Sequence, residues 1–333
     1  MTTVLVTGAC GYIGSHVCKH LTAAGYRVVG VDRVERDHTL PYMNFLINED
    51  YHSQGVANFL HDEQVHAVVH CAGTSLVGPS MHNPAEYYIN NVAKTAMFLD
   101  TLRKLPRPPV VVFSSSAAVY GNPEVDEITE AQSWNPVSPY GQSKAMIEIM
   151  LNDYCKAYNM TAMSLRYFNA CGADTESAAL GQAPFATHLI ARLLESLRDN
   201  TQFVLYGEDY NTPDGTCIRD YVHVDDLAHA HMLAIQYCMS FDEHKGTHYV
   251  LNLGSGHGYS NKEIIDAVSR CIGPVKYSVG PRRAGDPDRL VAGNFLALAS
   301  LGWKPEHSDL DTIINSAWKW YNNPPKSVDS QSK

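Results

Sequence analysis

The chain has 333 residues, of which 45% are hydrophobic, and a formal net charge of -10 at pH 7. This length suits about two domains, and the negative charge gives no general attraction to nucleic acid or to an anionic membrane. No apolar run reaches the roughly 18 residues that a membrane span needs, and no signal peptide is apparent. The eight cysteines form neither a Cys-x-x-Cys pair nor a Cys/His cluster. They predict reduced thiols, a cytoplasmic protein and no metal site.

Short apolar runs alternate with longer segments of helical period over the first half of the chain. We expect strands at Thr3–Thr7, Arg27–Asp32, Ala67–Cys71, Pro109–Ser114 and Thr161–Tyr167. Helices are expected between them at Tyr12–Ala24, Ser53–His61, Pro84–Leu105 and Pro139–Tyr158. The alternation predicts an α/β fold with a doubly wound parallel sheet and helices on both faces.

The pattern loosens after about Cys171, where a Gly-, Pro- and charge-rich stretch, Gly207–Gly215, interrupts it. Later helices are expected at Val224–Tyr237, Asn261–Cys271 and Asp309–Tyr321. We therefore predict a nucleotide-binding domain over residues 1–172, to which some elements around 216–255 return. Residues 173–323 should form a smaller α/β substrate-binding domain, and the polar residues 324–333 should be a disordered tail.

A glycine-rich turn follows the first predicted strand. Gly8, Gly11 and Gly14 have GxxGxxG spacing and open directly into a helix, whose N-terminus favours phosphate groups. Asp32 ends the second strand, where a carboxylate accepts hydrogen bonds from a ribose 2′-hydroxyl and repels a 2′-phosphate. The pattern predicts a Rossmann-like site that prefers NAD to NADP, with Arg33 as a mild counter-signal.

A second glycine cluster, Gly254–Gly258, also follows a strand-like run. No acidic residue ends the following strand at the right distance. We therefore predict a loop with positive φ angles rather than a second nucleotide site.

Tyr140 and Lys144 lie four residues apart at the start of a predicted helix, so they share one helix face. A lysine ammonium, together with an oxidised nicotinamide ring, could lower the pKa of the tyrosine from about 10 towards neutrality. Ser114-Ser115-Ser116 lies at the end of the predicted strand Pro109–Ser114, at the sheet edge where such folds bind ligands. The pattern favours Tyr140 as general base, Lys144 as its electrostatic partner and Ser116 as a proton-sharing hydroxyl.

These motifs resemble those of the UDP-glucose 4-epimerases, within the extended short-chain dehydrogenase/reductase family. The resemblance rests on the segments Thr7–Gly14, Ser114–Gly121, Ser138–Lys144, Leu165–Asn169, Asp214–Val224 and Pro281–Asp286, and it runs from Thr3 to about Trp303. It implies NAD as cofactor, a UDP-sugar as substrate and a cleft between two domains. The implied reaction oxidises the sugar at C4, turns the 4-keto sugar over while UDP stays anchored, and reduces it on the other face.

The resemblance also implies site residues. Those for catalysis are Ser116, Tyr140 and Lys144. Those for NAD are Gly8, Gly11, Tyr12, Ile13, Gly14, Asp32, Asp50, Tyr51, Cys71, Ala72, Gly73, Asn91, Ser114, Tyr140, Lys144 and Phe168. Those for the UDP-sugar are Ser116, Tyr140, Asn169, His188, Leu189, Tyr206, Arg219, Arg283, Asp286 and Leu290.

The chain departs from the family pattern at two places. Members of the family often carry a lysine two residues after the Ala-Gly pair that here follows the predicted strand Ala67–Cys71, and Ser75 stands there. The segment after Asp32 is short, which implies a more open adenine side. For Arg219, the alternative to a phosphate contact is a surface ion pair with Asp220.

Other functions remain open from the sequence. The chain could epimerise a UDP-pentose such as UDP-arabinose or UDP-xylose, or it could be a non-catalytic NAD-binding protein. A dehydratase or decarboxylase would need an acidic residue where Ala117-Ala118 stands. The resemblance further implies a homodimer through Pro84–Leu105 and Pro139–Tyr158, with Met97, Met146, Ile149 and Met150 as a possible seam, although some of these fit a monomer core equally well.

Overall fold

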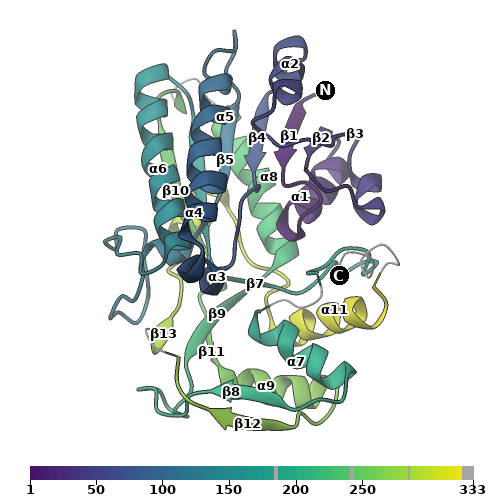
Figure 1. The fold of residues 1–333 in the computed structure, drawn as a ribbon, viewed down its shortest axis with the longest axis vertical. Coiled ribbons are helices and arrows are strands. Elements are labelled where there is room, and N and C mark those ends of the chain that lie inside the picture. Colours follow the sequence, from purple (N-terminus) through teal and green to yellow (C-terminus); the bar gives the residue numbers. More distant parts are fainter. Residues whose placement is uncertain (184–186, 241–243, 284–285, 325–333) are drawn as a thin grey trace.

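The structure, a computed structural model, describes residues 1–183, 187–240, 244–283 and 286–324. Its largest sheet has seven strands, all parallel, in the order β10-β6-β5-β4-β1-β2-β3 (Figure 1). The strands are β1 (Thr3–Thr7), β2 (Arg27–Val31), β3 (Phe45–Ile47), β4 (Ala67–His70), β5 (Val110–Ser116), β6 (Ala162–Tyr167) and β10 (His248–Leu253). The predicted doubly wound sheet is confirmed, because its first six strands follow the order typical of dinucleotide-binding folds.

Helices pack on both faces of this sheet, and each face has its own apolar core. One face carries α1 (Tyr12–Ala23), α8 (Val224–Ser240) and α10 (Phe295–Leu301). The other carries α2 (Gln54–Asp62), α5 (Lys94–Leu102) and α6 (Pro139–Tyr158). The strands are apolar along their whole length because both of their faces are covered.

Helix α6 has the bounds that the sequence predicts, because both of its ends carry strong signals. The Ser138 side chain accepts a hydrogen bond from the Gly141 N–H, and Pro139 occupies the first turn. At the other end Asn159 adopts a left-handed conformation with φ of 56°. These signals fix the start of the helix, and with it the position of Tyr140.

The predicted helix Pro84–Leu105 is interrupted. The chain forms α3 (Val77–His82), α4 (Pro84–Tyr87), a π-helical turn η2 (Tyr88–Ala93) and then α5. Buried Asn91 lies in this turn, where its side chain bonds both backbone groups of Thr74 and the hydroxyl of Ser143. A wide turn of this kind often marks a functional site, and periodicity alone cannot detect it.

The rest of the chain forms a second layer of structure below the large sheet in Figure 1. Its strands are β7 (Asn169–Cys171), β8 (Phe203–Tyr206), β9 (Ile218–His223), β11 (Gly258–Ser260), β12 (Tyr277–Gly280) and β13 (Arg289–Leu290). Its helices α7 (Leu189–Arg198), α9 (Asn261–Cys271) and α11 (Leu310–Asn322) share a separate apolar core. In the large-sheet part of the chain, short 3₁₀ turns lie at η1 (Asp37–Tyr42), after β2, and at η3 (Ala117–Val119), after β5. Strand β10 falls within 216–255 and lies at the edge of the large sheet beside β6.

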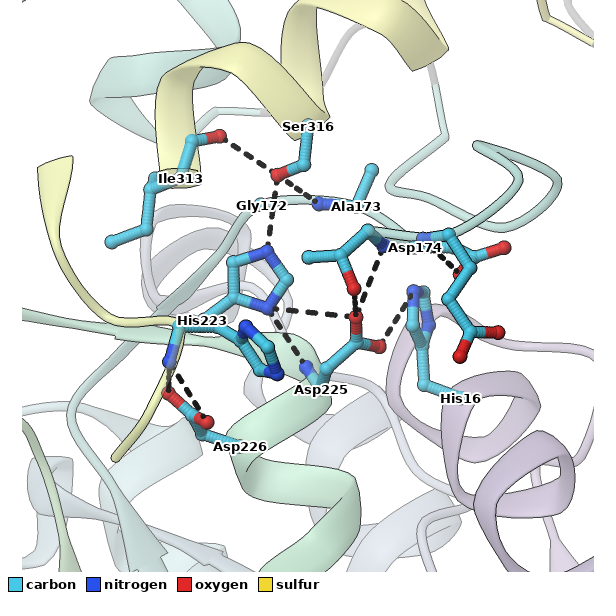
Figure 2. Close-up of polar contacts among 12 residues, drawn as sticks. His16, Gly172, Ala173, Asp174, His223, Asp225, Asp226, Ile313 and Ser316 are labelled. Carbon is cyan, nitrogen blue, oxygen red and sulfur yellow. Dashed lines mark hydrogen bonds and ion pairs between the residues drawn. The ribbon is translucent and has the colours of Figure 1, made fainter. Parts of the chain in front are cut away.

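Polar contacts tie the two layers together where β9 runs into α8 (Figure 2). The Nδ1 atom of buried His223 accepts a hydrogen bond from the Asp225 N–H at 3.0 Å, so the neutral ring carries its proton on Nε2. That Nε2–H donates to the Ser316 hydroxyl of α11 at 3.0 Å, and the same hydroxyl accepts from the Ala173 N–H. Because the network joins β9, α8 and α11, it holds α11 against the start of α8, which packs on the large sheet.

In the part of the chain that the structure describes, none of the helices has the length and apolar character that crossing a bilayer demands. Nor do His, Cys, Asp or Glu side chains there gather in a group of three that could bind a metal ion. The predicted disordered tail lies outside the described residues except for Pro324.

Candidate active site

The site lies at the carboxyl ends of β1 and β4, where the strand order of the large sheet reverses. Gly8, just after β1, has φ of +69°, and a Cβ there would lie 2.9 Å from the Ala72 backbone nitrogen. A side chain at Gly8 would therefore be strained and would clash with the segment that follows β4. The close approach of these two segments forms the floor of a cavity.

The cavity has a volume of about 590 Å³ and is open to the start of α1. Gly11 caps this helix without a side-chain hydrogen bond, so the first-turn N–H groups are free to bind an anion. The residues predicted for NAD that line the cavity are Gly8, Gly11, Tyr12, Ile13, Gly14, Asp32, Asp50, Tyr51, Cys71, Ala72, Gly73, Tyr140 and Phe168. A free helix N-terminus at a glycine turn fits the pyrophosphate of a dinucleotide.

Asn91, Ser114 and Lys144, also predicted for NAD, do not line this cavity but lie just behind its wall. Asn91 holds Thr74, as described above, and the Ser114 hydroxyl donates to the Cys71 sulfur at 3.0 Å. These residues are therefore placed to shape the wall.

Asp32, Asp50 and Tyr51 lie on the predicted adenosine side. The Asp32 carboxylate accepts hydrogen bonds from the Cys10 and Val34 N–H groups, each at 3.0 Å, and so orients the glycine turn. Asp50 forms an ion pair with Lys94 at 2.8 Å. Tyr51 is buried, and its hydroxyl donates to the Asn90 carbonyl at 2.6 Å.

The three predicted catalytic residues come together at the other end of the cavity. Tyr140 hydrogen-bonds the Ser116 side chain, and the Lys144 ammonium lies 5.8 Å from the centre of the tyrosine ring. Lys144 donates to the Ser114 carbonyl at 2.7 Å, so it is fixed to the end of β5. A Cβ on Gly141 would lie 2.5 Å from the Ala118 carbonyl oxygen. Glycine at this position lets α6 pack tightly enough on η3 for Tyr140 to reach Ser116.

Burial controls the protonation of these groups. It raises the pKa of Tyr140, and the hydrogen bond from Ser116 offsets this only in part. Burial also lowers the pKa of Lys144 to about 8. The expected lowering of the tyrosine pKa is not produced by the protein groups around it, because desolvation of the phenolate outweighs the hydrogen bond from Ser116. The nicotinamide cation remains the second charge on which that expectation depended.

A second cavity, of about 610 Å³, adjoins the first and shares with it Asn169, Ala170, Gln182 and His188. The predicted substrate residues that line it are Asn169, His188, Leu189, Tyr206, Arg219, Arg283 and Asp286. Those that line the first cavity are Ser116, Tyr140, Asn169, His188 and Leu290. The substrate residues that the sequence predicts are therefore divided between two adjoining cavities.

Four arginines line the second cavity, and two of them, Arg219 and Arg283, are among the predicted substrate residues. Arg219 donates to the Asp286 carboxylate at 2.6 Å and to the Pro287 carbonyl at 2.8 Å. The Arg283 guanidinium stacks over Tyr206, 4.5 Å from the ring centre. Planar guanidinium groups on one cavity wall suit a pyrophosphate, and the stacked tyrosine leaves an aromatic surface beside it.

Asp220 does not form the ion pair with Arg219 that the sequence left as an alternative. Its buried carboxylate instead accepts hydrogen bonds from the N–H groups of Ser255, Gly256 and Ala292. Burial raises the pKa of Asp220 to about 6. Gly256 has φ of +74°, so the prediction of a positive-φ loop at the second glycine cluster is confirmed.

The structure adds two residues that the sequence patterns did not single out. The Tyr210 hydroxyl donates to Asp286 at 2.9 Å and so helps to orient the partner of Arg219. Arg36 lines the first cavity beside the glycine turn. Neither residue falls in a motif of the glycine, tyrosine-lysine or arginine type, so only the fold reveals its position.

The glycine turn, the strand order and the Tyr140 cluster define the class of protein: a dinucleotide-dependent enzyme with a second, arginine-lined cavity beside its cofactor cavity. A model of the NAD dependent epimerase/dehydratase family matches residues 4–254. The chain belongs to this family.

Similar proteins include a UDP-glucose 4-epimerase of Lactobacillus helveticus, 39% identical over 333 residues, covering 98% of this chain and 99% of that protein. A structure of UDP-glucose 4-epimerase from Brucella ovis in complex with NAD has a TM-score of 0.91 and 41% identity, with 96% of this chain and 98% of that one covered. The enzyme from Bifidobacterium longum, in complex with NAD⁺ and UDP, has a TM-score of 0.88 and 34% identity, covering 98% and 100% of the two chains.

Proposed function

We propose that this enzyme inverts the configuration at C4 of UDP-hexoses and thereby interconverts UDP-glucose and UDP-galactose with NAD as cofactor. The observation that carries this proposal is the adjacency of the two cavities, with Tyr140 lining the first and both Arg219 and Arg283 lining the second. A nucleotide pyrophosphate held by the arginines would place a sugar next to the tyrosine. The similar UDP-glucose 4-epimerases support the same reaction.

In this proposal Tyr140 takes the proton of the sugar 4-hydroxyl, and Ser116 hydrogen-bonds the same oxygen. Lys144 stabilises the phenolate and fixes the end of β5 through the Ser114 carbonyl. NAD, when bound, supplies a reversible hydride acceptor. Arg219 and Arg283 hold UDP in place while the keto sugar turns over. Residues 1–172 provide most of the cofactor side and residues 173–323 most of the UDP side.

The test is an assay of the purified enzyme over a panel of UDP-sugars, without added reductant. UDP-galactose should convert to UDP-glucose until both are present, with no net change in the oxidation state of the cofactor. Turnover confined to UDP-arabinose and UDP-xylose would favour the pentose alternative. No turnover of any UDP-sugar would sink the proposal and leave a non-catalytic NAD-binding protein.

We propose that Leu290 limits the size of the substituent that fits beside the sugar. It lies on β13, lines the first cavity and packs near Ala117 and Phe168, close to Ser116. The resemblance implies that family members restricted to plain hexoses carry a bulky tyrosine at this position. Because leucine is smaller than tyrosine, we expect the enzyme to accept UDP-N-acetylgalactosamine as well as UDP-galactose. Changing Leu290→Tyr should lower kcat/KM for the acetylated sugar by about tenfold or more, because the ring would occupy the acetamido space.

The measurement is the ratio of the two kcat/KM values in the wild type and in the variant. Leu290→Met is the matched control, because it keeps the volume and should leave the ratio nearly unchanged. If wild-type enzyme ignores the acetylated sugar, or if tyrosine leaves the ratio unaltered, Leu290 does not set this specificity.

We also propose a homodimer through the segment α4–η2–α5 and α6, which lie side by side. Ile89, Met97 and Ile149 on these elements are each at least half exposed, at 57%, 57% and 50%. Met150, by contrast, is partly buried and packs against the apolar core on this face of the sheet. A second copy that covered the exposed residues would bury an apolar face of the kind that marks interfaces.

Ile149→Arg should therefore convert a dimer of 36.8-kDa chains into monomers, because the interface would bury an unpaired charge. The mass is measured by light scattering at micromolar concentration. Met239→Arg is the control, since Met239 is 40% exposed on α8, which covers the other face of the sheet. A wild-type protein with the mass of a single chain would refute the dimer.

All eight cysteines are free thiols, which supports a reducing compartment such as the cytoplasm. The negative net charge supports a small-molecule substrate rather than nucleic acid or a membrane as partner.

A further inference from the structure

The cofactor cavity is lined by carboxylates, although the cofactor that it is proposed to bind is itself negatively charged. NAD carries a pyrophosphate with two negative charges, and the position where the resembled family often has a lysine is Ser75. The cavity is also lined by Asp32, Glu49 and Asp50. Without a compensating cation near the glycine turn, the pyrophosphate would depend on backbone N–H groups alone.

The cations that line the described cavity are Arg33, Arg36 and Lys94. Lys94 is engaged by Asp50 at 2.8 Å, and Asp50 also bonds His52. The charge of Lys94 is therefore largely neutralised within the adenosine side. Arg33 is exposed, so water screens it.

Arg36 differs from both. It is half-buried, and one N–H of its guanidinium donates to the Cys10 carbonyl at 2.6 Å. Cys10 lies inside the glycine turn, between Gly8 and Gly11. A guanidinium has five N–H donors in a planar fork, so this anchor leaves other donors available. The side chain is thus held at the turn whose helix N-terminus fits an anion.

We propose that Arg36 is the side-chain cation that binds the pyrophosphate of NAD, in place of the lysine that Ser75 replaces. The inference rests on NAD as the cofactor in the proposed function. A competing target is a ribose 2′-phosphate, as in NADP. The Asp32 carboxylate disfavours it, because hydrogen bonds from Cys10 and Val34 fix this negative charge beside the same turn.

The experiment measures binding of ADP-ribose and of adenosine to cofactor-free enzyme by calorimetry. ADP-ribose contains the pyrophosphate and adenosine lacks it. Arg36→Gln should weaken ADP-ribose binding about 10- to 100-fold, as expected for loss of a hydrogen bond to a charged group, and leave adenosine within about threefold. Arg36→Lys should retain most of the affinity, and Arg33→Gln is the matched control, with little effect on either ligand. Adding Ser75→Lys to Arg36→Gln should restore much of the lost ADP-ribose affinity.

Three results would overturn the inference. Unchanged ADP-ribose binding would show that Arg36 does not meet the phosphates. An equal loss for adenosine would show that Arg36 only shapes the turn. If NAD and NADP are titrated in the same way, a loss confined to NADP, with NAD and ADP-ribose binding intact, would assign Arg36 to a 2′-phosphate. Because these readouts need no turnover, an enzyme that binds ADP-ribose as expected but epimerises nothing would contradict the proposed function alone.

Discussion

Tyr140→Phe should lower kcat for epimerisation by about 10²- to 10⁴-fold, the usual cost of removing a general base. The variant loses only the hydroxyl that hydrogen-bonds Ser116, while the ring keeps its place above Lys144. NAD binding and the unfolding midpoint should therefore stay close to those of the wild type. The measurement is single-turnover conversion of UDP-galactose, with bound NAD quantified in the same preparation.

Tyr87→Phe is the matched control. Its ring packs edge-on against Tyr140 at 6.4 Å, and its hydroxyl bonds the Leu76 carbonyl, away from the proposed base. It should change the rate by only a few-fold. A Tyr140→Phe enzyme that keeps more than about a tenth of the wild-type rate would show that another group takes the proton.

Acid should destabilise the protein strongly between pH 6.5 and pH 5, because several histidines are buried in the neutral form. Burial lowers the pKa of His70 to about 3 and those of His223 and His231 to about 4. In the unfolded chain each would titrate near 6.5. Since their folded pKa values are depressed, their stabilising contribution is complete above about 6.5 and is lost as pH falls towards the folded values.

At pH 5 each of these histidines should remove about 2 kcal/mol from the free energy of unfolding. Asp220 acts in the opposite direction, because its pKa is raised to about 6. Its protonation in the folded state adds roughly 1 kcal/mol to the free energy of unfolding at pH 5. The net effect is a large fraction of the stability of a typical protein.

Urea unfolding at pH 7.5, 6.5, 5.5 and 5.0, values chosen to bracket the transition, measures this effect. His223→Gln tests one contributor. Glutamine can still bond Ser316 but cannot take up a proton, so its stability should fall less steeply between roughly pH 6.5 and 5. A wild-type free energy of unfolding that stays flat over this range would refute the prediction.

The sequence predicted the elements that carry local signals. The N-cap at Ser138, Pro139 and the left-handed Asn159 set the bounds of α6, and these are visible in the residue types. The capping box of Ser260 and Glu263 likewise fixes the start of α9 at the predicted residue. Such elements are predictable because the interactions that define them lie within a few residues of one another.

Features that depend on distant residues were not predictable. The π-helical turn around Asn91 exists beside Thr74 and Ser143, which lie far away in the sequence. Asp220 turned out to bind the second glycine cluster and Ala292 rather than its neighbour Arg219. The positions of Tyr210 beside Asp286 and of Arg36 beside Cys10 depend on contacts between residues that are distant in the sequence. The assignment of roles to the site residues remains a prediction that the variants above address.

The late position of β10 in the chain affects folding during synthesis. This strand completes the edge of the large sheet by pairing with β6, yet it follows the whole segment from β7 to α8 along the chain. When residues 1–172 have emerged from the ribosome, the sheet that they form still has an unpaired β6 edge. An unpaired edge strand can pair with other chains. The sheet can be completed only after β10 emerges, late in synthesis, so the nascent chain should depend on chaperones or on rapid translation of this middle segment.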